Sequence, residues 1–243
     1  MRKQKIIAVI PARYAATRFP AKLMKPLGDK PVIAHTYEAV AASGLFSDVF
    51  VVTDSDIIFN EIATRGGKAI MSTAEHESGT DRIAEAVRDM DVDIIVNVQG
   101  DEPFMQQEPL QKIVSLFDTE QVQVGSLMRK FASENEAQNP NAVKVVTNKA
   151  GRALYFSRSV IPYRRDTDIP VPYYLHIGVY AFRKNALLDF TGWPPSLLEQ
   201  TEKLEQLRFL DNGVDIYLAE TSYETVAIDT PEDLERAITI LNQ

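Results

Sequence analysis

Continuously apolar runs separated by helical patterns constrain the fold of this chain more than any other feature. Residues 6–10 are all apolar, and strand-like runs recur at 49–53 and 68–71. A strand that is apolar on both faces is typical of a sheet that helices cover on both sides. Amphipathic helices are predicted between these runs, one beginning at Pro31 and one from Asp54 to about residue 65. This β-α-β-α-β order predicts a parallel sheet with right-handed crossovers.

A loop rich in positive charge follows the first apolar run. Between residues 11 and 30 stand five lysines or arginines and one acid, Asp29, although the whole chain carries a formal charge of −8. Ligands of open α/β sheets bind outside the carboxyl ends of the strands. The loop therefore predicts a site for a polyanionic ligand, and an ordinary solvated loop is the second interpretation. Its cations are Arg13, Arg18, Lys22, Lys25 and Lys30.

Two acidic residues at strand ends are candidate ligands of a metal ion. Asp101 follows the strand-like run 93–98 in a Gly-Asp-Glu-Pro turn, and Asp229 follows a predicted strand at 224–228. Mg²⁺ usually takes one or two protein carboxylates and fills its other positions with water and phosphate oxygens. Gly-Asp also suits a turn without any metal. Placed after a strand and opposite a basic loop, the acids favour a magnesium site.

A third polar segment, residues 75–82, precedes a helix with an apolar stripe. Ser78 suits the capping position of that helix, and Gly79 lets the backbone approach a ligand closely. A capped helix start explains these two residues without a ligand, but it explains the flanking His76 and Arg82 less well. From the residues alone, helix capping and ligand binding are equal interpretations.

The alternation of strands and helices changes beyond residue 122. Strands are predicted at 122–128, 142–147 and 153–156, so antiparallel or mixed strands extend one edge of the sheet. We expect one domain, 1–243, with this smaller sheet as an insertion around 122–172. The other predicted elements are a short helix at 133–138, a strand at 175–182, helices at 184–190 and 196–210, strands at 214–219 and 224–228, and a helix that begins at Thr230 and Pro231.

Composition and missing motifs exclude several classes of protein. The 243 residues contain no cysteine, which excludes disulfides, thiolate nucleophiles and cysteine-ligated metal centres. The net negative charge argues against broad binding to nucleic acid or anionic membranes. The apolar run near the N-terminus is too short for a signal peptide or a membrane span, so we expect a cytoplasmic protein. The P-loop, G-x-G-x-x-G, H-E-x-x-H and G-x-S-x-G motifs are absent. The remaining features suit phosphoryl or nucleotidyl transfer.

Blocks in a fixed order cover nearly the whole chain: I-P-A-R-Y and T-R-F-P-A-K within 10–22, H-E-S-G-T-D-R at 76–82, V-N-V-Q-G-D-E-P at 96–103, N-P-N-A-V-K-V-V at 139–146, A-L-Y-F-S-R at 153–158, H-I-G-V-Y at 176–180, L-E-Q-L-R at 204–208 and D-T-P-E-D-L at 229–234. This ordered set resembles the 3-deoxy-manno-octulosonate cytidylyltransferases (CMP-Kdo synthetases), a family of sugar nucleotidyltransferases with a GT-A-like, Rossmann-like α/β fold. Two positions depart from the family pattern. Ala16 stands where serine is common, and Ala21 where glycine is common.

The resemblance implies a reaction and the residues that carry it. CTP and 3-deoxy-D-manno-octulosonate (Kdo) would give CMP-Kdo and pyrophosphate for lipopolysaccharide biosynthesis, with Mg²⁺ assisting in-line attack of the anomeric hydroxyl on the α-phosphorus. The catalytic residues would be Arg13, Lys22, Asp101 and Asp229, the last two as metal ligands. The nucleotide would be bound by Pro11, Ala12, Arg13, Arg18, Lys22, Ser78, Arg82 and Gln99. The sugar would be bound by Arg158, His176, Tyr180, Glu205 and Gln206. A homodimer is also implied, with 122–172 as its dimerisation region.

Simpler explanations exist for most of the sugar-binding set. His176 and Tyr180 would equally suit the outer face of a strand, and Glu205 and Gln206 a solvated helix face. Two other functions stay open: a cytidylyltransferase for 8-amino-Kdo or a sialic-acid-like sugar, and a non-catalytic nucleotide-sensing or scaffold protein. The non-catalytic protein would fit loss of the metal-binding acids, but both acids are present.

Overall fold

The computed structural model describes residues 4–15, 19–76, 78–166 and 168–242, and the chain divides into two compact units. The first unit joins Met1–Leu110 to Glu224–Gln243, and the second is Gln111–Tyr223. The predicted insertion at 122–172 falls within the second unit. No helix in the described ranges is both long and apolar enough to cross a membrane.

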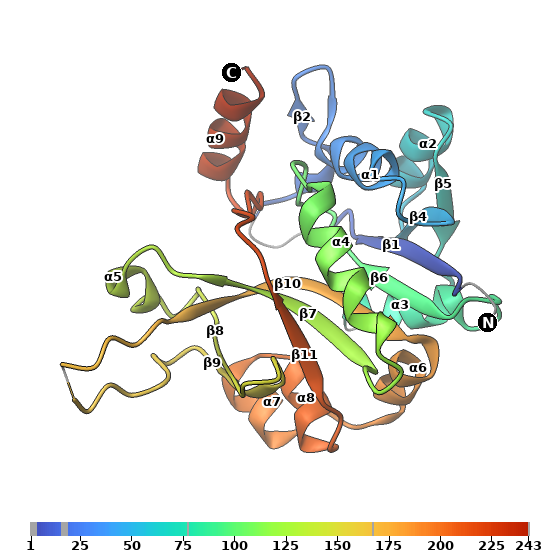
Figure 1. Ribbon diagram of the computed structural model, residues 1–243. Coiled ribbons are helices and arrows are strands. Elements are labelled where there is room, and N and C mark those ends of the chain that lie inside the picture. Colours follow the sequence, from blue (N-terminus) through green and yellow to red (C-terminus); the bar gives the residue numbers. More distant parts are fainter. Residues whose placement is uncertain (1–3, 16–18, 77, 167, 243) are drawn as a thin grey trace. The chain divides into compact units, whose positions relative to one another are not determined.

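The first unit is built around a parallel sheet in the order β6-β1-β4-β5 (Figure 1). This confirms the predicted mostly parallel sheet flanked by helices. Its strands are β1 Ile6–Ala12, β4 Asp48–Thr53, β5 Lys68–Met71 and β6 Ile94–Asn97, with a separate antiparallel hairpin of β2 Pro26–Leu27 and β3 Lys30–Pro31. Its helices are the 3-10 helix η1 Lys22–Met24, α1 Val32–Ala42, α2 Asp56–Thr64, α3 Gly79–Val87 and α9 Pro231–Leu241; α4, Gln107–Ser115, begins in this unit and ends in the second.

The winding of the chain determines where this sheet can bind a ligand. The chain moves outward from β1 to β4 to β5, and then returns to β6 on the other side of β1. Right-handed crossovers therefore place α1 and α2 on one face and α3 on the other, as Figure 1 shows. The direction of winding reverses between β1 and β6, and ligands bind beyond the carboxyl ends of the strands at such a point. Both strands are almost wholly buried, so they hold the residues that follow them firmly in place.

The second unit contains a mixed sheet in the order β11-β7-β10-β8-β9. β11 runs parallel to β7, whereas the other neighbours are antiparallel, which confirms the predicted antiparallel or mixed region. Its strands are β7 Val124–Lys130, β8 Lys144–Thr147, β9 Ala153–Ser157, β10 Tyr174–Arg183 and β11 Ile216–Glu220. Its helices are η2 Leu116–Asp118, α5 Glu134–Ala137, α6 Lys184–Gly192, α7 Leu197–Glu202 and α8 Gln206–Asp211.

Two element predictions are wrong. The single helix expected at 196–210 is two helices, because Lys203 has a left-handed backbone (φ 53°) at the end of α7. A residue in this conformation ends a helix. The strand expected at 224–228 does not form, and within that described stretch the backbone N–H of Ile228 donates instead to the Asp101 carbonyl at 3.0 Å. The sequence patterns also missed η1, α4 and the β2–β3 hairpin.

Candidate active site

A cavity of about 370 Å³ lies in the first unit, beyond the carboxyl ends of β1 and β6. Its walls come from the end of β1, the loop after it, η1, the start of α3 and the turn after β6. Five residues predicted to bind nucleotide or metal share this cavity: Pro11, Arg13, Lys22, Gln99 and Asp101. Ala15, Leu23, Gly79 and Gly100 complete its lining. The structure therefore gathers segments that are far apart in the sequence at the point where the winding reverses.

Two glycines allow the backbone walls of this cavity to approach each other. A Cβ atom on Gly79 would lie 3.3 Å from the Pro11 ring, and one on Gly100 would lie 3.1 Å from the Pro11 carbonyl oxygen. The hydroxyl of Thr36, a fully buried residue of α1, donates to the Gly100 carbonyl at 2.9 Å. The turn that carries Gln99 and Asp101 is therefore fixed against both β1 and α1.

Lys22 lies between the two acids predicted to bind a metal. Its ammonium group donates to Asp229 Oδ1 at 2.9 Å and also to Asp101 Oδ2. The bond from Ile228 N to the Asp101 carbonyl brings residue 229 to the turn after β6. Burial alone would lower the pKa of Lys22, but the two carboxylates outweigh burial and raise it. Lys22 is therefore a firmly held cation at the centre of the site.

The donor atoms of Asp101 and Asp229 suit a magnesium ion. Among the described residues, no group of three or more histidine or acidic side chains could hold a metal. Asp101 and Asp229 would supply two carboxylates. Mg²⁺ commonly binds through one or two carboxylates together with substrate phosphates. Both carboxylates already point at one positive charge, the ammonium of Lys22. The pair therefore fits a metal ion that is shared with a triphosphate.

The segment before α3 contacts the predicted phosphate-binding arginine. Arg13 Nη2 donates to the backbone carbonyl of His76 at 2.9 Å. Ser78 is the N-cap of α3, and its hydroxyl oxygen accepts from the Asp81 backbone N–H at 3.1 Å. Helix capping therefore describes the side chain of Ser78, while the next residue, Gly79, lines the cavity. The predicted contact of Ser78 with a nucleotide stays a prediction.

Arg82 lies in the interior of the first unit and does not line the cavity. It is 1% exposed, and its Nη2 donates to Asp54 Oδ2 at 2.6 Å just beyond β4. Its Nε and Nη1 atoms are buried, and none of the described residues accepts a hydrogen bond from them. Leaving a buried donor unpaired costs about 1–3 kcal/mol. Arg82 therefore retains donors for an acceptor that reaches it, and its role in nucleotide binding stays a prediction.

The other predicted nucleotide-binding residues differ in accessibility. Gln99 lines the cavity, and its side-chain amide lies 3.3 Å from Asn97 Oδ1. Ala12 is fully buried in β1, so only its backbone is available to a ligand. Arg18 and the departure at Ala16 lie outside the described residues. Ala21 is described, and it has a left-handed backbone with φ 54° directly before η1.

The predicted sugar-binding residues lie in the second unit, and Arg158 connects them to the turn between α7 and α8. Arg158 Nε donates to the Glu202 carbonyl at 2.6 Å, and Nη2 donates to the Lys203 carbonyl at 3.3 Å. Nη1 donates to the Pro140 carbonyl at 3.1 Å. A guanidinium group has about five N–H donors. These three bonds, made to described residues, hold its orientation and use three of those N–H groups.

His176 and Tyr180 are neighbours on β10, with ring centroids 5.3 Å apart. His176 Nε2 lies 2.9 Å from the hydroxyl of Ser126 on β7. Burial lowers the pKa of His176 to about 3, so its ring is neutral near pH 7. Burial, and then the charge of Glu205, raise the pKa of Tyr180. Gln206 is buried, whereas Glu205 is exposed, so the solvated helix face expected for this pair holds for Glu205 alone.

Two charged residues that contact Arg158 were missed by the sequence analysis. The carboxylate of Glu202 accepts from Ser157 Oγ at 2.7 Å and from the Arg158 backbone N–H at 3.0 Å. Lys144 is fully buried and donates to the carbonyls of Asn139 and Arg158. Burial, and then the charge of Arg158, lower the pKa of Lys144. Lys144 lies within the N-P-N-A-V-K block, and this position could have indicated its role. Glu202 lies in none of the blocks, so it had no such indication.

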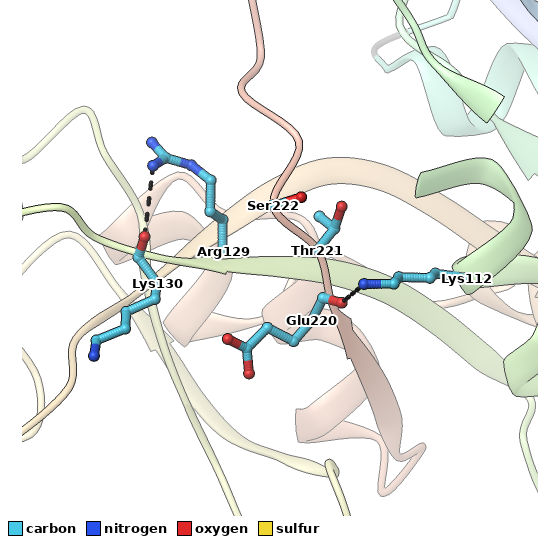
Figure 2. Close-up of a pocket in the computed structure, with 6 residues that line it drawn as sticks. All are labelled: Lys112, Arg129, Lys130, Glu220, Thr221 and Ser222. Carbon is cyan, nitrogen blue, oxygen red and sulfur yellow. Dashed lines mark hydrogen bonds between the residues drawn. The ribbon is translucent and has the colours of Figure 1, made fainter. Parts of the chain in front are cut away.

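A larger cavity of about 550 Å³ lies in the second unit and contains none of the predicted residues (Figure 2). Figure 2 shows the side chains of Arg129 and Lys130 pointing to opposite sides of β7. Lys112 Nζ donates to the backbone carbonyl of Glu220 at 2.7 Å, and the carboxylate of Glu220 stands among the cations. The positive groups therefore do not converge on one point. The smaller cavity of the first unit has the convergent chemistry that an anionic nucleotide requires.

Comparison with known proteins identifies the family. The family profile described as cytidylyltransferase matches residues 7–216, most of the chain. The chain belongs to the cytidylyltransferase family. Within this family it is similar to a 3-deoxy-manno-octulosonate cytidylyltransferase of Flavobacterium johnsoniae, with 60% identity over 240 residues that cover 98% of each chain. A protein of the same name from Christiangramia forsetii is 54% identical over 243 residues, which cover 99% of this chain and 98% of that one.

A solved structure supports the same relationship. The chain is similar to the structure of CMP:2-keto-3-deoxy-manno-octonic acid synthetase complexed with CTP, with a TM-score of 0.94 and 38% sequence identity. The match covers 99% of this chain and 99% of that one. The resemblance that the ordered sequence blocks indicated is therefore confirmed for the cytidylyltransferase family.

Proposed function

We propose that the protein transfers CMP from CTP to the anomeric hydroxyl of Kdo and releases pyrophosphate. The observation that carries this proposal is the 60% identity, over 98% of the chain, to a 3-deoxy-manno-octulosonate cytidylyltransferase. The cavity lined by Arg13, Lys22 and Asp101 supports the nucleotide half of the reaction. The polar side chains of His176 and Tyr180 on β10, with Glu205 near Tyr180, support the sugar half. The product would serve lipopolysaccharide biosynthesis.

The proposed reaction is an in-line displacement at the α-phosphorus of CTP. The anomeric oxygen forms a new bond to that phosphorus and gives its proton to solvent water. The bond from the phosphorus to the oxygen that bridges to the β-phosphate breaks, and pyrophosphate leaves with the electron pair. Arg13 and Lys22 would neutralise the triphosphate, with Arg18 assisting. Because such transfers depend on positioning and on neutralising charge, the protein needs no covalent nucleophile.

Asp101 and Asp229 would hold Mg²⁺ in this reaction. A bound Mg²⁺ polarises phosphate oxygens and lowers the pKa of an attacking hydroxyl. In the structure the ammonium of Lys22 occupies the acceptor atoms of both acids. Lys22 would therefore release the two carboxylates and bind the triphosphate oxygens instead. Mg²⁺ would then replace the ammonium of Lys22 between Asp101 and Asp229.

The second unit offers groups that match an acidic sugar. The guanidinium of Arg158 would pair with the sugar carboxylate, since guanidinium and carboxylate bind each other well. Neutral His176 exchanges hydrogen bonds with hydroxyl groups without adding charge. The raised pKa of Tyr180 keeps its hydroxyl protonated, so it remains a donor. Glu205 and Gln206 at the start of α8 add further partners for sugar hydroxyls.

We also propose that the protein is a cytoplasmic homodimer, joined through the second unit. Tyr163 is 87% exposed, and Ile169 and Leu154 are each 56% exposed. Contiguous exposed apolar patches mark interaction sites, and these three side chains all belong to the second unit. A Tyr163→Asp variant should shift the protein toward monomers in sedimentation velocity, and a monomeric wild-type protein would contradict the dimer. The cytoplasmic location follows from the use of CTP as a substrate.

Pyrophosphate release from CTP tests the proposed function. Kdo, 8-amino-Kdo and a sialic acid are compared with CTP and UTP, with and without Mg²⁺. Release should be fastest with CTP and Kdo, and should require Mg²⁺. Asp101→Asn should lower kcat by about 100-fold, since it removes a metal ligand, whereas Asp89→Asn on the exposed surface should not. A higher kcat/KM for another sugar would contradict Kdo, and no release with any sugar would contradict the reaction.

A further inference from the structure

One carboxylate of α3 gathers four donors from the segment 72–76. Glu85 Oε1 accepts from the Thr73 backbone N–H at 3.0 Å and from the Thr73 hydroxyl. Its Oε2 accepts from Ser72 Oγ at 2.8 Å and lies 2.6 Å from His76 Nε2. The Thr73 hydroxyl, outweighing partial burial, and then the His76 and Ser72 side chains lower the pKa of Glu85 to about 2. Glu85 is therefore a charged anchor for this segment.

The anchored segment has no regular secondary structure of its own between β5 and α3. At its start, Ser72 N donates to the Thr53 carbonyl at 2.8 Å, beside β4. Beyond this bond, the carboxylate of Glu85 ties the segment to α3. A segment without helix or strand bonds keeps one conformation only if side chains satisfy its polar groups. Glu85 accepts hydrogen bonds from three residues of the segment, Ser72, Thr73 and His76.

The last residue of the segment contacts the nucleotide cavity. The backbone carbonyl of His76 accepts from Arg13 Nη2 at 2.9 Å, and Arg13 lines the cavity. The side chain of the same His76 is held by Glu85. The position of this carbonyl, and with it the direction of the Arg13 guanidinium, therefore depends on the bonds that Glu85 makes.

We propose that Glu85 is a positioning residue for nucleotide binding, which acts on Arg13 through the segment 72–76. This inference rests on the proposed function of the cavity as the CTP site. Glu85 belongs to none of the sequence blocks that indicated the family. In this proposal Glu85 orients Arg13, which would bind the triphosphate. A charged group that is already held in one direction loses less conformational entropy on binding than a mobile one.

A double-mutant cycle on CTP affinity tests the proposal. Calorimetry without sugar measures CTP binding to the wild-type protein, to Glu85→Ala, to Arg13→Ala and to the double variant. Glu85→Ala should weaken binding by about tenfold. In the Arg13→Ala background the same substitution should cost less than about twofold, because the residue through which Glu85 acts is gone. Glu85→Gln keeps one acceptor oxygen and should lie between wild type and Glu85→Ala.

A matched control and a second substrate separate positioning from general stability. Glu61 on α2 is a helix carboxylate of similar exposure (23% against 26% for Glu85), and Glu61→Ala should leave CTP affinity unchanged. In steady-state assays Glu85→Gln should raise KM for CTP and leave KM for Kdo unchanged. Additive losses in the cycle, or full CTP affinity in a folded Glu85→Ala variant, would overturn the proposal. A wild-type protein that does not bind CTP would instead overturn the proposed function.

Discussion

Replacing Lys22 with methionine should change the affinities for metal and for nucleotide in opposite directions. The ammonium of Lys22 occupies the oxygens of Asp101 and Asp229 that would hold Mg²⁺. A divalent cation that binds without nucleotide must therefore displace it. Lys22→Met removes this competitor and leaves two carboxylates facing each other, so the nucleotide-free protein should bind a divalent cation more tightly. The same change removes a cation that we propose binds the triphosphate, so CTP should bind more weakly.

The size of the gain follows from the two ion pairs. Lys22 and Asp101 are 18% and 19% exposed, and a hydrogen bond between charged groups in such a setting contributes about 1.5–3 kcal/mol. Asp229 is 42% exposed, so solvent screens its pair with Lys22 and reduces its contribution to about 0–1 kcal/mol. The first pair dominates. A release of about 1.5–3 kcal/mol corresponds to roughly 10- to 150-fold tighter binding of the cation.

Titration with Mn²⁺ in the absence of nucleotide, followed by electron paramagnetic resonance, measures this affinity. Lys22→Arg retains a cation and should stay near the wild-type value. Lys68→Met, which breaks the Lys68–Asp48 ion pair of β5 and β4, is the control for loss of a lysine. Adding Asp101→Asn to Lys22→Met should abolish the gain. Unchanged or weaker Mn²⁺ binding by a folded Lys22→Met protein would refute the idea that Lys22 competes with the metal.

Three further substitutions have defined outcomes. Ala21→Gly should stabilise the protein by about 0.5–1 kcal/mol in urea unfolding, because a left-handed backbone costs alanine about 1–2 kcal/mol and glycine's extra entropy loss offsets part of the gain; a loss of stability would contradict this. Thr36→Val leaves the buried carbonyl of Gly100 without its hydroxyl donor, so it should cost about 1–3 kcal/mol in urea unfolding and raise KM for CTP. His176→Asn should make the free energy of unfolding less sensitive to acid. The pKa of His176 is about 3 in the folded protein and about 6.5 in the unfolded chain. The contribution of this residue to wild-type stability is therefore complete above a pH of about 6.5, and it falls by up to about 1.4 kcal/mol per pH unit as the pH drops toward 3. Equal losses for wild type and His176→Asn between pH values of about 7 and 5 would contradict that assignment.

The parts of the structure that the sequence predicted are those that local patterns determine. A continuous run of apolar residues predicts a buried strand, so the parallel core around β1 and β6 was predictable from the sequence. The end of α7 at Lys203 was not predictable, because glycine is the residue that commonly indicates a left-handed helix end and lysine is not. The ordered blocks named Lys22, Asp101 and Asp229 individually. Their meeting depends on a bond from Ile228 to Asp101, between residues far apart in the chain, which no local pattern contains.

Supporting residues were hidden for a related reason. Glu85 and Glu202 each stand on a helix, where an acidic residue is ordinarily solvated. Glu85 and Glu202 matter because they accept hydrogen bonds from neighbouring segments. The donors are serine and threonine side chains and backbone N–H groups, which are common in any sequence. A sequence shows the carboxylate but not the number of donors that converge on it. Such residues become visible only when tertiary contacts are known.

The first unit is assembled from both ends of the chain, Met1–Leu110 and Glu224–Gln243, which has a consequence for synthesis on the ribosome. Lys22 and Asp101 emerge early, but Asp229 follows only after the whole second unit has been translated. A nascent chain that ends before residue 229 therefore carries only one of the two acids that we propose as metal ligands. If Asp229 is a metal ligand as proposed, products that terminate before residue 229 would lack it, and the order of the residues would delay activity until the second unit has been translated.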